Sequence, residues 1–395
     1  MKKTITIVGG HIIGGQLGGP TTNISEFTRI LKNNFRINVI SPNSNYTNQI
    51  IRDGDLTIYL ESNRLLMPFF IAYRLFKLIS ESDVIHFHSP KTALLGLFIR
   101  DKPVVLTLHG YYSKEAMKFD NILLNILIST FFKWIEYISI KRADSIIVVG
   151  KGISNYLVDE YNISPQKISF IPNGIDSDAI ELSCKKNYNM SNLLREELNL
   201  KNKKVLLFIK SFEKYNGIIE LINSMPIVLK NHPNAHLIAI GGGKLKNDIV
   251  ILCKRLNIES NVTIIDQIPY DSVPIYLNIA NIFIVPFIPP YISGNQVAGV
   301  GDTLGIVHLE AMAAKVPVIG TAIGNIAKLE FEIDNALKYV KPGDITELAE
   351  MIIYLLNSPQ LSEDIGKMGK KIVFQKYDIR KLSQDISNVY YSLIK

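Results

Sequence analysis

At 395 residues the chain is too long for one ordinary domain, and its 47% hydrophobic and 20% charged residues are typical of a globular protein. No apolar run approaches the length of about 18 residues that crosses a bilayer, which excludes a multi-spanning membrane protein. The formal net charge of +7 is spread over both halves without a basic tail, so we expect no nucleic-acid partner. Cys184 and Cys253 are too few for a disulfide framework or a structural zinc site, and the apolar stretch Ile5–Val8 is too short for a signal peptide. These features predict a cytoplasmic protein.

Short runs rich in Val and Ile alternate with longer helical patterns through the first half of the chain. Strands are predicted at Ile5–Val8, Ile37–Ile40, Val84–Phe87, Val104–Leu108, Ser145–Val149 and Ile168–Ile171, with a polar strand near Leu56–Tyr59. Helices are predicted at Thr22–Lys32, Leu65–Ser80, Ile122–Lys141 and Ile153–Glu160. Strands that are apolar throughout are typical of parallel sheets buried on both faces. A doubly wound α/β domain is therefore expected.

The pattern restarts in the second half, after a polar stretch from 176 to 202 that we interpret as a hinge and an insert. Strands are predicted at Val205–Ile209, Ala235–Ile240, Val262–Ile265, Ile282–Pro286 and Val316–Thr321. Helices are predicted at Gly217–Leu229, Lys244–Leu256, Val273–Asn278, Gly305–Ala314 and Ile345–Leu356. We expect two Rossmann-like domains, 1–178 and 179–379, that face each other across a cleft, with ligands at the carboxyl ends of the strands.

The first turn between strand and helix is dense in glycine. Its glycines are Gly9, Gly10, Gly14, Gly15, Gly18 and Gly19. Glycine lets backbone N–H groups approach a phosphate or a sugar closely at a helix N-terminus, and a purely structural turn is the alternative. The spacing is neither the dinucleotide fingerprint nor the P-loop, and Ser41-Pro42-Asn43 follows the second strand where a ribose-binding acid would stand. An NAD enzyme is therefore disfavoured.

Three histidines stand at the ends of two successive predicted strands. His86 and His88 share a face of the first, and we interpret them as polar packing at the top of the sheet. His109 ends the next strand, where catalytic groups collect in such folds, and a glycine follows it. His109 is therefore the candidate for chemistry. No nearby carboxylate or cysteine completes a set of metal ligands, so no metal is expected.

The stretch 301–314 carries the most informative pattern. The residues from Thr303 to Ile306 would lie at a helix start, where free backbone N–H groups can bind a diphosphate. Glu310 lies further along that helix, where a carboxylate can accept from two ribose hydroxyls. Asp302 would point toward whatever is attached beyond the phosphates. On these residues alone the alternative stays open, namely that Asp302 is a helix cap and Glu310 a solvated helix residue.

The spacing Asp302-x7-Glu310, with Leu304-Gly305-Ile306 and Glu310-Ala311-Met312-Ala313, resembles the Glu-x7-Glu signature of the retaining glycosyltransferase family 4. Further motifs agree in the same order: Gly14-Gly15 with Gly18-Gly19, Leu108-His109-Gly110, Ile171-Pro172-Asn173-Gly174-Ile175-Asp176 and Lys341-Pro342-Gly343-Asp344. Each is weak alone, but this order over essentially the whole chain is specific. The resemblance implies a GT-B fold, with a nucleotide-sugar donor held mainly by the second domain and the acceptor mainly by the first.

The resemblance also implies which residues contact the donor phosphates. The segment Thr303–Ile306 is expected to bind them through its backbone, and the loop at Gly18 and Gly19 is expected near them. Basic side chains and helix-end amides would stabilise the departing diphosphate. Lys210 is the candidate for this cation and for a part in catalysis.

For the rest of the donor, the resemblance implies that Glu310 holds the ribose, while Asp302 and His109 contact the sugar that is transferred. The residues from about 380 to 395 are expected to form a helix that packs back onto the first domain. Transfer would retain the anomeric configuration without a metal or any other cofactor.

The chain departs from the family pattern at its basic residues. The family has an Arg and then a Lys directly before a Gly, whereas this chain has Lys210 in the Arg position and Asn216 before Gly217. Lys210 keeps the charge but not the bidentate fork of Arg. Lys214 is the nearest other cation and is kept as a donor-binding candidate. Asp302 is also one methylene shorter than the family's Glu, so a weakened or inactive relative stays open.

Two apolar segments, 64–77 and 122–140, bear on the acceptor. Each is rich in aromatic residues and carries or precedes cations, as in basic amphipathic helices that lie on an anionic membrane. A peripheral position on the inner face of a membrane is therefore an expectation, and two core helices of a parallel sheet are the alternative. The cations of the two segments are Arg64, Arg74, Lys77, Lys141 and Arg142.

Together these features predict a metal-independent, retaining glycosyltransferase. It would move a hexose-type sugar from a nucleoside-diphosphate sugar to a glycan or lipid-linked acceptor. A nucleotide-sugar epimerase or phosphorylase on the same architecture stays open, as does a non-catalytic relative that binds nucleotides or glycans. The base, the sugar, the acceptor and the linkage do not follow from the sequence.

Overall fold

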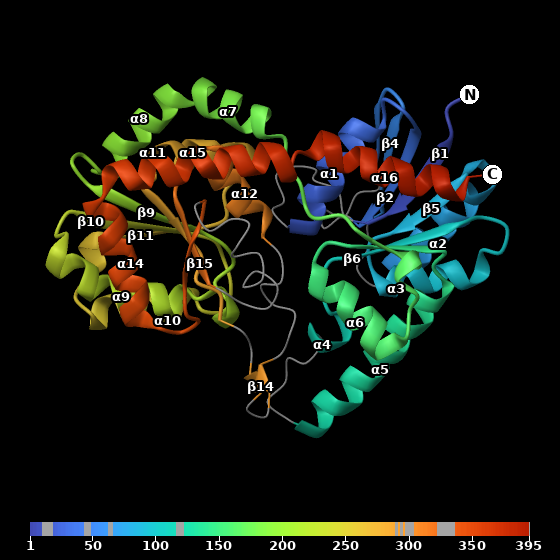
Figure 1. The fold of residues 1–395 in the computed structure, drawn as a ribbon, viewed down its shortest axis with the longest axis horizontal. Helices are drawn as coiled ribbons and strands as arrows, with labels where there is room; N and C mark the ends of the chain where they lie inside the picture. Colours follow the sequence, from blue (N-terminus) through green and yellow to red (C-terminus); the bar gives the residue numbers. More distant parts are fainter. Residues whose placement is uncertain are drawn as a thin grey trace. The chain divides into compact units, whose positions relative to one another are not determined.

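The computed structural model places the chain in two units, each built around its own sheet (Figure 1). The first unit holds the described residues before Ile175 and those from Ile379 onward, and the second unit is Ile175–Asp378. The boundary set from the sequence, after residue 178, lies a few residues further along the chain. The described residues are 1–9, 19–42, 49–61, 66–115, 122–288, 291–292, 295–296, 304–321 and 336–394.

The sheet of the first unit has the strand order β3-β4-β2-β1-β5-β6-β7-β8. Its strands are β1 Thr4–Val8, β2 Arg36–Pro42, β3 Gln49–Asp53, β4 Leu56–Glu61, β5 Val84–Phe87, β6 Val104–Leu108, β7 Ser145–Val148 and β8 Ile168–Phe170. Among these described strands β3 alone runs antiparallel to its neighbour, β4. The predicted parallel sheet is confirmed, and β3 was not predicted because its mostly exposed residues form no apolar run.

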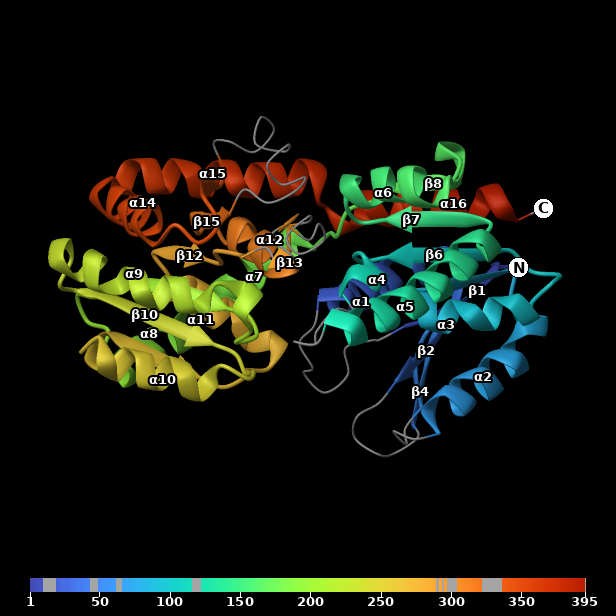
Figure 2. The same cartoon turned by 90° about the horizontal axis from the view of Figure 1, so that it is seen from below.

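Helices cover both faces of this sheet, as the doubly wound prediction requires. They are α1 Gly19–Leu31, α2 Met67–Leu78, α3 Pro90–Ala93, α4 Tyr112–Glu115, α5 Ile122–Arg142, α6 Lys151–Tyr161 and α16 Ile379–Leu393. On one face, Phe27 of α1 and Tyr390 of α16 pack in one core with Ile7 of β1. On the other face, Leu75 of α2 packs in a core that includes Phe87 of β5. Figure 2 shows the same layers from below.

The second unit contains a parallel sheet with the order β11-β10-β9-β12-β15-β16. Its strands are β9 Lys204–Ile209, β10 Ala235–Ile240, β11 Val262–Ile265, β12 Ile282–Ile284, β15 Val318–Thr321 and β16 Lys338–Val340. Two short strands, β13 Tyr291–Ile292 and β14 Asn295–Gln296, form a separate antiparallel pair. The helices of the second unit are α7 Ser177–Lys186, α8 Tyr188–Glu197, α9 Ile218–Asn231, α10 Lys246–Arg255, α11 Val273–Ile279, α12 Ile306–Ala313, α14 Ile345–Asn357 and α15 Pro359–Lys376.

The polar stretch from 176 to 202 is not the hinge that its composition predicted. It forms α7 and α8, which pack against α11, and α7 also packs against α12. Asp176 caps α7 by accepting a hydrogen bond from the Ala179 amide at 3.0 Å. Ile180 and Ser191 are buried, while most other side chains of the two helices are exposed or half-buried. A narrow buried stripe on otherwise polar helices explains why the sequence pattern was misread.

Across the ranges that the structure describes, no helix combines the length and the apolar character needed to cross a bilayer.

Candidate active site

Three histidines gather at the carboxyl ends of β5 and β6, which are neighbours in the first sheet. The Nδ1 atom of His88 and the Nε2 atom of His109 are 2.9 Å apart and share a hydrogen bond. Their rings stack with centroids 5.2 Å apart. His109 therefore lies at the carboxyl end of β6, as the sequence predicted. The interpretation of His88 as packing alone missed this direct contact, which depends on the pairing of two strands.

His86 is bonded on both sides within the interior of the first unit. Its Nδ1 atom lies 2.6 Å from the hydroxyl of Tyr390 in α16, and its Nε2 atom lies 2.7 Å from Oγ1 of Thr107 in β6. Phe27 of α1 stacks on both His86 and His88. His86 thus joins α16 to the two central strands and supports the ring of His88.

Burial keeps the three imidazoles neutral at physiological pH. It lowers the pKa of His109 to about 4 and that of His86 to about 3, and it holds the pKa of His88 well below its ordinary value. For His86 and His88 the neighbouring imidazoles act in the same direction. A neutral imidazole has one N–H donor and one acceptor, so each ring can orient a polar group but contributes no charge.

The second group of candidate residues lies in the second unit, around the start of α12. Lys210 directly follows β9 and is half-buried as a residue, while burial of its ammonium group lowers the pKa of that group. The Nζ atom lies 5.5 Å from the ring centroid of Phe287, a cation–π arrangement. The same Nζ atom would lie 3.6 Å from a Cβ atom at Gly305. A buried cation therefore stands beside the residue that precedes α12.

Gly305 has little spare room around it, because the side chains of His308 and Lys210 lie close. A Cβ atom there would come within 3.1 Å of Nδ1 of His308, as well as close to Lys210. His308 is buried against Phe283 and Phe287. Burial, with a smaller contribution from Lys210, lowers the pKa of His308 to about 3. The sequence analysis did not single out His308.

The start of α12 can bind an anion through its backbone. Gly305 occupies the N-cap position, and the helix begins at Ile306. The first N–H groups of a helix have no acceptor within it, and the helix dipole adds positive potential there. Leu304 and Ile306 are buried, and Glu310 is 2% exposed. The interpretation of Glu310 as a solvated helix residue is therefore wrong.

The position at which the sequence resemblance implies a second cation holds a structural amide instead. The Nδ2 atom of Asn216 donates to the carbonyl oxygen and to Oγ of Ser211, both at 2.8 Å, and the residue is fully buried. Gly217 follows with φ +74°, and a Cβ atom there would overlap the carbonyl oxygen of Pro286. Asn216 and Gly217 thus build a tight turn. Lys214 is exposed in the short 3₁₀ helix Lys214–Asn216.

Several candidates lie outside the described residues, namely Gly18, Asp302 and Thr303. Gly19 is described only as the first residue of α1. Within the described ranges, no group of three or more His, Cys, Asp or Glu side chains is arranged to hold a metal ion.

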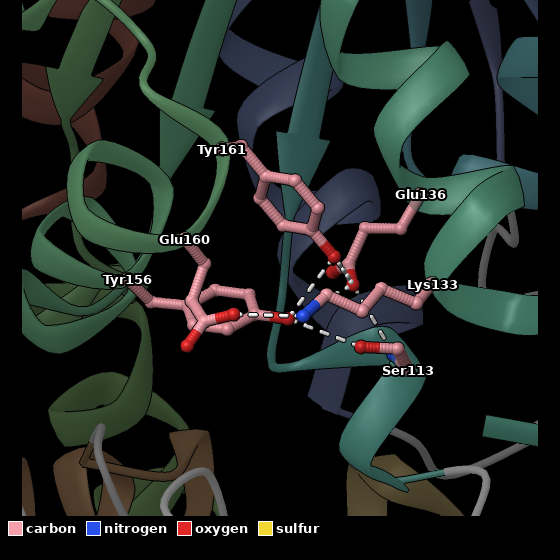
Figure 3. Close-up of polar contacts among 6 residues, drawn as sticks. All are labelled: Ser113, Lys133, Glu136, Tyr156, Glu160 and Tyr161. Atoms are coloured by element: carbon pink, nitrogen blue, oxygen red, sulfur yellow. Dashed lines mark hydrogen bonds and ion pairs between the residues drawn. The ribbon is translucent and has the colours of Figure 1, made fainter. Parts of the chain in front are cut away.

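A second polar cluster lies between α4, α5 and α6 and was not predicted (Figure 3). Its centre is Glu136 of α5, whose side chain is fully buried. The Oε2 atom accepts from the hydroxyl of Tyr161 at 2.8 Å, from that of Tyr156 at 3.3 Å and from the amide of Ser113 at 3.4 Å. Ser113 comes four residues after His109 in the chain. Its hydrogen bond to Glu136 therefore anchors the segment that follows the histidine cluster. The sequence signal that could have indicated this cluster is the acidic residue Glu136 within a largely apolar helical segment.

Comparisons with known proteins cover both units. A model described as "Glycosyltransferase Family 4" matches residues 17–179, and one described as "Glycosyl transferases group 1" matches residues 190–372. The capsular polysaccharide biosynthesis glycosyltransferase CapM of Staphylococcus aureus is 24% identical over 394 residues, which cover 94% of this chain and 93% of that protein.

Two further proteins are similar over nearly their whole length. The UDP-Gal:alpha-D-GlcNAc-diphosphoundecaprenol alpha-1,3-galactosyltransferase of Escherichia coli is 22% identical over 392 residues, covering 95% of this chain and 94% of that protein. The structure of Anabaena HepE in complex with UDP-glucose superposes with a TM-score of 0.73 at 18% identity, covering 99% of this chain and 100% of that one. The structural likeness establishes the two-domain fold.

Proposed function

The chain belongs to glycosyltransferase family 4 and has the GT-B fold, and on that premise we propose that it moves a hexose-type sugar from a nucleoside-diphosphate sugar to a glycan or lipid-linked acceptor. We propose further that transfer retains the anomeric configuration and uses no catalytic metal or other cofactor. The observation that carries the proposal is the buried ammonium group of Lys210 beside the start of α12 at Gly305. That arrangement suits the diphosphate of such a donor.

The proposed donor site uses the second unit for the nucleotide and the phosphates. Backbone N–H groups at the start of α12 would bind the diphosphate, together with Thr303 and Leu304, and the loop at Gly18 and Gly19 is proposed as a further phosphate contact. The buried carboxylate of Glu310 would accept hydrogen bonds from the ribose hydroxyls. Lys214 would serve as an outer cation, since it is exposed.

Lys210 has the chemistry to assist departure of the leaving group. As the glycosidic bond breaks, negative charge grows on the diphosphate. A cation held in a site with little water stabilises that charge more strongly than a solvated one and needs no rearrangement at the moment of reaction. His109 and Asp302 would face the sugar that is transferred and fix its orientation.

The relatives guide the choice of substrates. The E. coli protein is named for a UDP-galactose donor and a diphosphoundecaprenol-linked acceptor, CapM is named for capsular polysaccharide, and HepE was solved with UDP-glucose. UDP-hexoses are therefore the first donors to test, and lipid-linked or growing glycans the first acceptors.

Peripheral contact with an anionic membrane is part of the proposal. Helices α2 and α5 present large apolar side chains to solvent, with Phe69 72% and Trp134 58% exposed. Lys77 lies over the ring of Tyr73 on α2, at 4.5 Å from its centroid. Exposed aromatic rings beside cations are typical of surfaces that enter a lipid interface.

The cations on α2 and α5 differ in whether they are already bound to other groups of the protein. Lys141 lies 5.7 Å from the ring centroid of Tyr137 on α5. Arg74 instead pairs with the buried carboxylate of Glu61 at 2.7 Å, and Arg142 donates to the carbonyl oxygen of Gly96 at 2.8 Å. We therefore assign membrane attraction to Lys77 and Lys141 and a structural role to the two arginines. Arg64 lies outside the described residues.

A stability screen with nucleotide sugars, followed by product analysis, tests the proposed function. A ligand at 100 times its Kd should add about 2.7 kcal/mol to the stability of the folded state. Products formed only when an acceptor is present would support transfer. Conversion of the donor without an acceptor would point to an epimerase, and phosphate-dependent cleavage to a phosphorylase. Failure of every nucleotide sugar to stabilise the protein or to turn over would refute the proposal.

The role of Lys210 has a direct test in UDP binding measured by calorimetry. Lys210→Met should weaken UDP binding about 10- to 100-fold, because a hydrogen bond to a charged group contributes about 1.5–3 kcal/mol. The matched control is Lys254→Met, since Lys254 is an exposed cation on α10. Equal UDP affinity of both variants would remove Lys210 from the site.

A further inference from the structure

The contact between His88 and His109 leaves one ring nitrogen of each histidine without a hydrogen bond. The shared bond joins Nδ1 of His88 to Nε2 of His109. The other two nitrogens, Nε2 of His88 and Nδ1 of His109, are buried and have no hydrogen-bond partner in the described part of the chain. One of the two rings must donate in the shared bond, so the arrangement allows two tautomers.

The ring of His88 is packed against Phe27, His86 and Gly9. Phe27 stacks on it with centroids 5.5 Å apart, and His86 lies 4.3 Å away. Gly9, at the end of β1, leaves room for it, because a Cβ atom at Gly9 would come within 3.0 Å of the Cβ atom of His88. His88 is 9% exposed. Its Nδ1 atom therefore has a fixed position relative to His109.

The two tautomers differ in which buried N–H group is left without an acceptor. If His109 donated through Nε2, the proton of His88 would sit on Nε2, as a buried N–H without an acceptor in the described part of the chain. If His88 donates through Nδ1, its Nε2 atom is only an unused acceptor, and the N–H without an acceptor is the Nδ1–H of His109. Buried N–H groups without acceptors are costly. An oxygen of the transferring sugar beside His109 would accept from that group and remove the cost in the second tautomer, whereas in the first tautomer the N–H of His88 would stay unpaired.

We propose that His88 is a positioning residue, whose Nδ1–H donates to Nε2 of His109 and thereby holds His109 in the tautomer that presents Nδ1–H to an oxygen of the transferring sugar. This inference rests on the proposed contact between His109 and the donor sugar. Both rings are neutral at physiological pH, so the tautomer, rather than a charge, decides what His109 offers. In the other tautomer His109 would offer a lone pair and could not donate to a sugar oxygen.

Imidazole nitrogen shifts in the protein labelled with ¹⁵N-histidine give a first test that does not depend on activity. The chain has seven histidines, which keeps such a spectrum assignable. With the most stabilising nucleotide sugar bound, we expect His109 to carry its proton on Nδ1 in the wild type and in His88→Asn, because the Asn amide can donate from nearly the same place as Nδ1 of His. In His88→Leu the Nδ1–H tautomer should lose its dominance. A proton on Nε2 of His109 in the wild type would overturn the proposal.

Turnover supplies the second test, using the nucleotide sugar that stabilises the protein most in the screen above. His88→Leu should lower kcat about 10- to 100-fold with little change in KM, because misplacement of a reacting group is felt at the transition state. His88→Asn should recover most of that loss. His236→Leu is the control for removing a buried histidine, since His236 bonds to Thr263 in the second unit. It should leave kcat near the wild-type value.

The outcomes separate the two levels of inference. If His109→Ala lowers kcat while His88→Leu leaves it unchanged, the positioning role of His88 is refuted and the role of His109 stands. If His109→Ala is itself silent in an active enzyme, the proposed sugar contact fails, and the positioning role fails with it. A drop in kcat for His88→Leu that His88→Asn does not reverse would also count against the proposal, because it would reflect packing alone.

Discussion

The Nδ1 atom of His86 lies 2.6 Å from the hydroxyl oxygen of Tyr390, although 304 positions separate the two residues in the chain. Burial raises the pKa of the Tyr390 hydroxyl, so the hydroxyl stays protonated and can donate or accept in this bond, according to the tautomer of His86. The Nε2 atom of His86 bonds to Oγ1 of Thr107 on the other side of the ring. The C-terminal helix α16 is thus bonded directly into the strand that precedes His88.

We expect Tyr390→Phe to destabilise the first unit by about 1–3 kcal/mol, because it leaves a buried ring nitrogen of His86 without its hydrogen-bond partner. Trp134 is the single tryptophan of the chain and belongs to the first unit, so its fluorescence during urea unfolding reports that unit. Tyr391→Phe is the matched control, since the neighbouring Tyr391 is 50% exposed. Equal unfolding midpoints for the two variants would contradict the expectation.

Glu136 should matter far more to stability than its neighbour Glu160. Glu136→Ala removes the buried acceptor of Tyr161, Tyr156 and Ser113, so we expect a loss of about 1–3 kcal/mol for each buried donor left without an acceptor. Glu160→Ala breaks an exposed pair with Lys133 and should cost at most about 1 kcal/mol. Urea unfolding measures both, and similar losses would show that the cluster in Figure 3 is not a structural centre.

The sequence predicted the strands well because burial on both faces leaves an unbroken apolar run. β5 and β6 were read at their observed bounds for this reason. The sheet order then follows from the doubly wound pattern, and it brings His109 to the carboxyl edge. What could not be predicted is the 2.9 Å contact with His88, because strand ends show which residues are near but not which atoms bond.

Two other features escaped prediction for different physical reasons. α7 and α8 are largely polar, and each buries only one or two residues. So few buried positions do not produce the periodic hydrophobic pattern by which a helix is predicted from sequence. Asn216 occupies a position where the family has a lysine, and no local pattern indicates that its amide donates to the carbonyl oxygen of Ser211. The buried side of a turn is decided by packing rather than by local sequence.

We expect binding to anionic vesicles to depend on Lys77 and Lys141. The double variant Lys77→Glu, Lys141→Glu should sediment less with vesicles that contain phosphatidylserine, because each cation near such a surface contributes about 1 kcal/mol. The control is Lys254→Glu with Lys371→Glu, which changes the net charge equally on exposed helix positions of the second unit. High salt should weaken binding of the wild type by screening. Binding that is the same for neutral and anionic vesicles at all salt concentrations would refute the assignment.

Transfer activity should survive a strong chelator of divalent ions. The chain has two Asp-x-Asp pairs, but Asp53 and Asp55 pair with Lys32 and Lys2, and Asp176 of the other pair caps α7. The expectation therefore comes from the cation Lys210 beside the start of α12, which can stabilise a departing diphosphate without a metal. Product formation with and without chelator measures it. Activity that disappears in chelator and returns with Mg²⁺ or Mn²⁺ would show that a metal is required.

The two carboxylates of the Asp302-x7-Glu310 motif should affect different steps. If Glu310 binds the ribose, Glu310→Gln should weaken donor binding about tenfold or more. An amide keeps one acceptor oxygen but loses charge-assisted bonds, each of which contributes about 1.5–3 kcal/mol. If Asp302 faces the transferring sugar, Asp302→Asn should lower turnover more than donor affinity. Donor Kd and kcat for both variants distinguish these effects.

Asp302→Glu and the capping alternative complete the test. Asp302→Glu restores the side chain that the family has at this position, so we expect turnover to be kept or raised. A helix cap predicts another pattern, in which Asp302→Asn is silent in stability and in turnover, because Asn caps a helix about as well as Asp. The N-cap position of α12 belongs to Gly305, three residues after Asp302, which argues against the capping alternative. A silent Asp302→Asn in an active enzyme would remove Asp302 from the site.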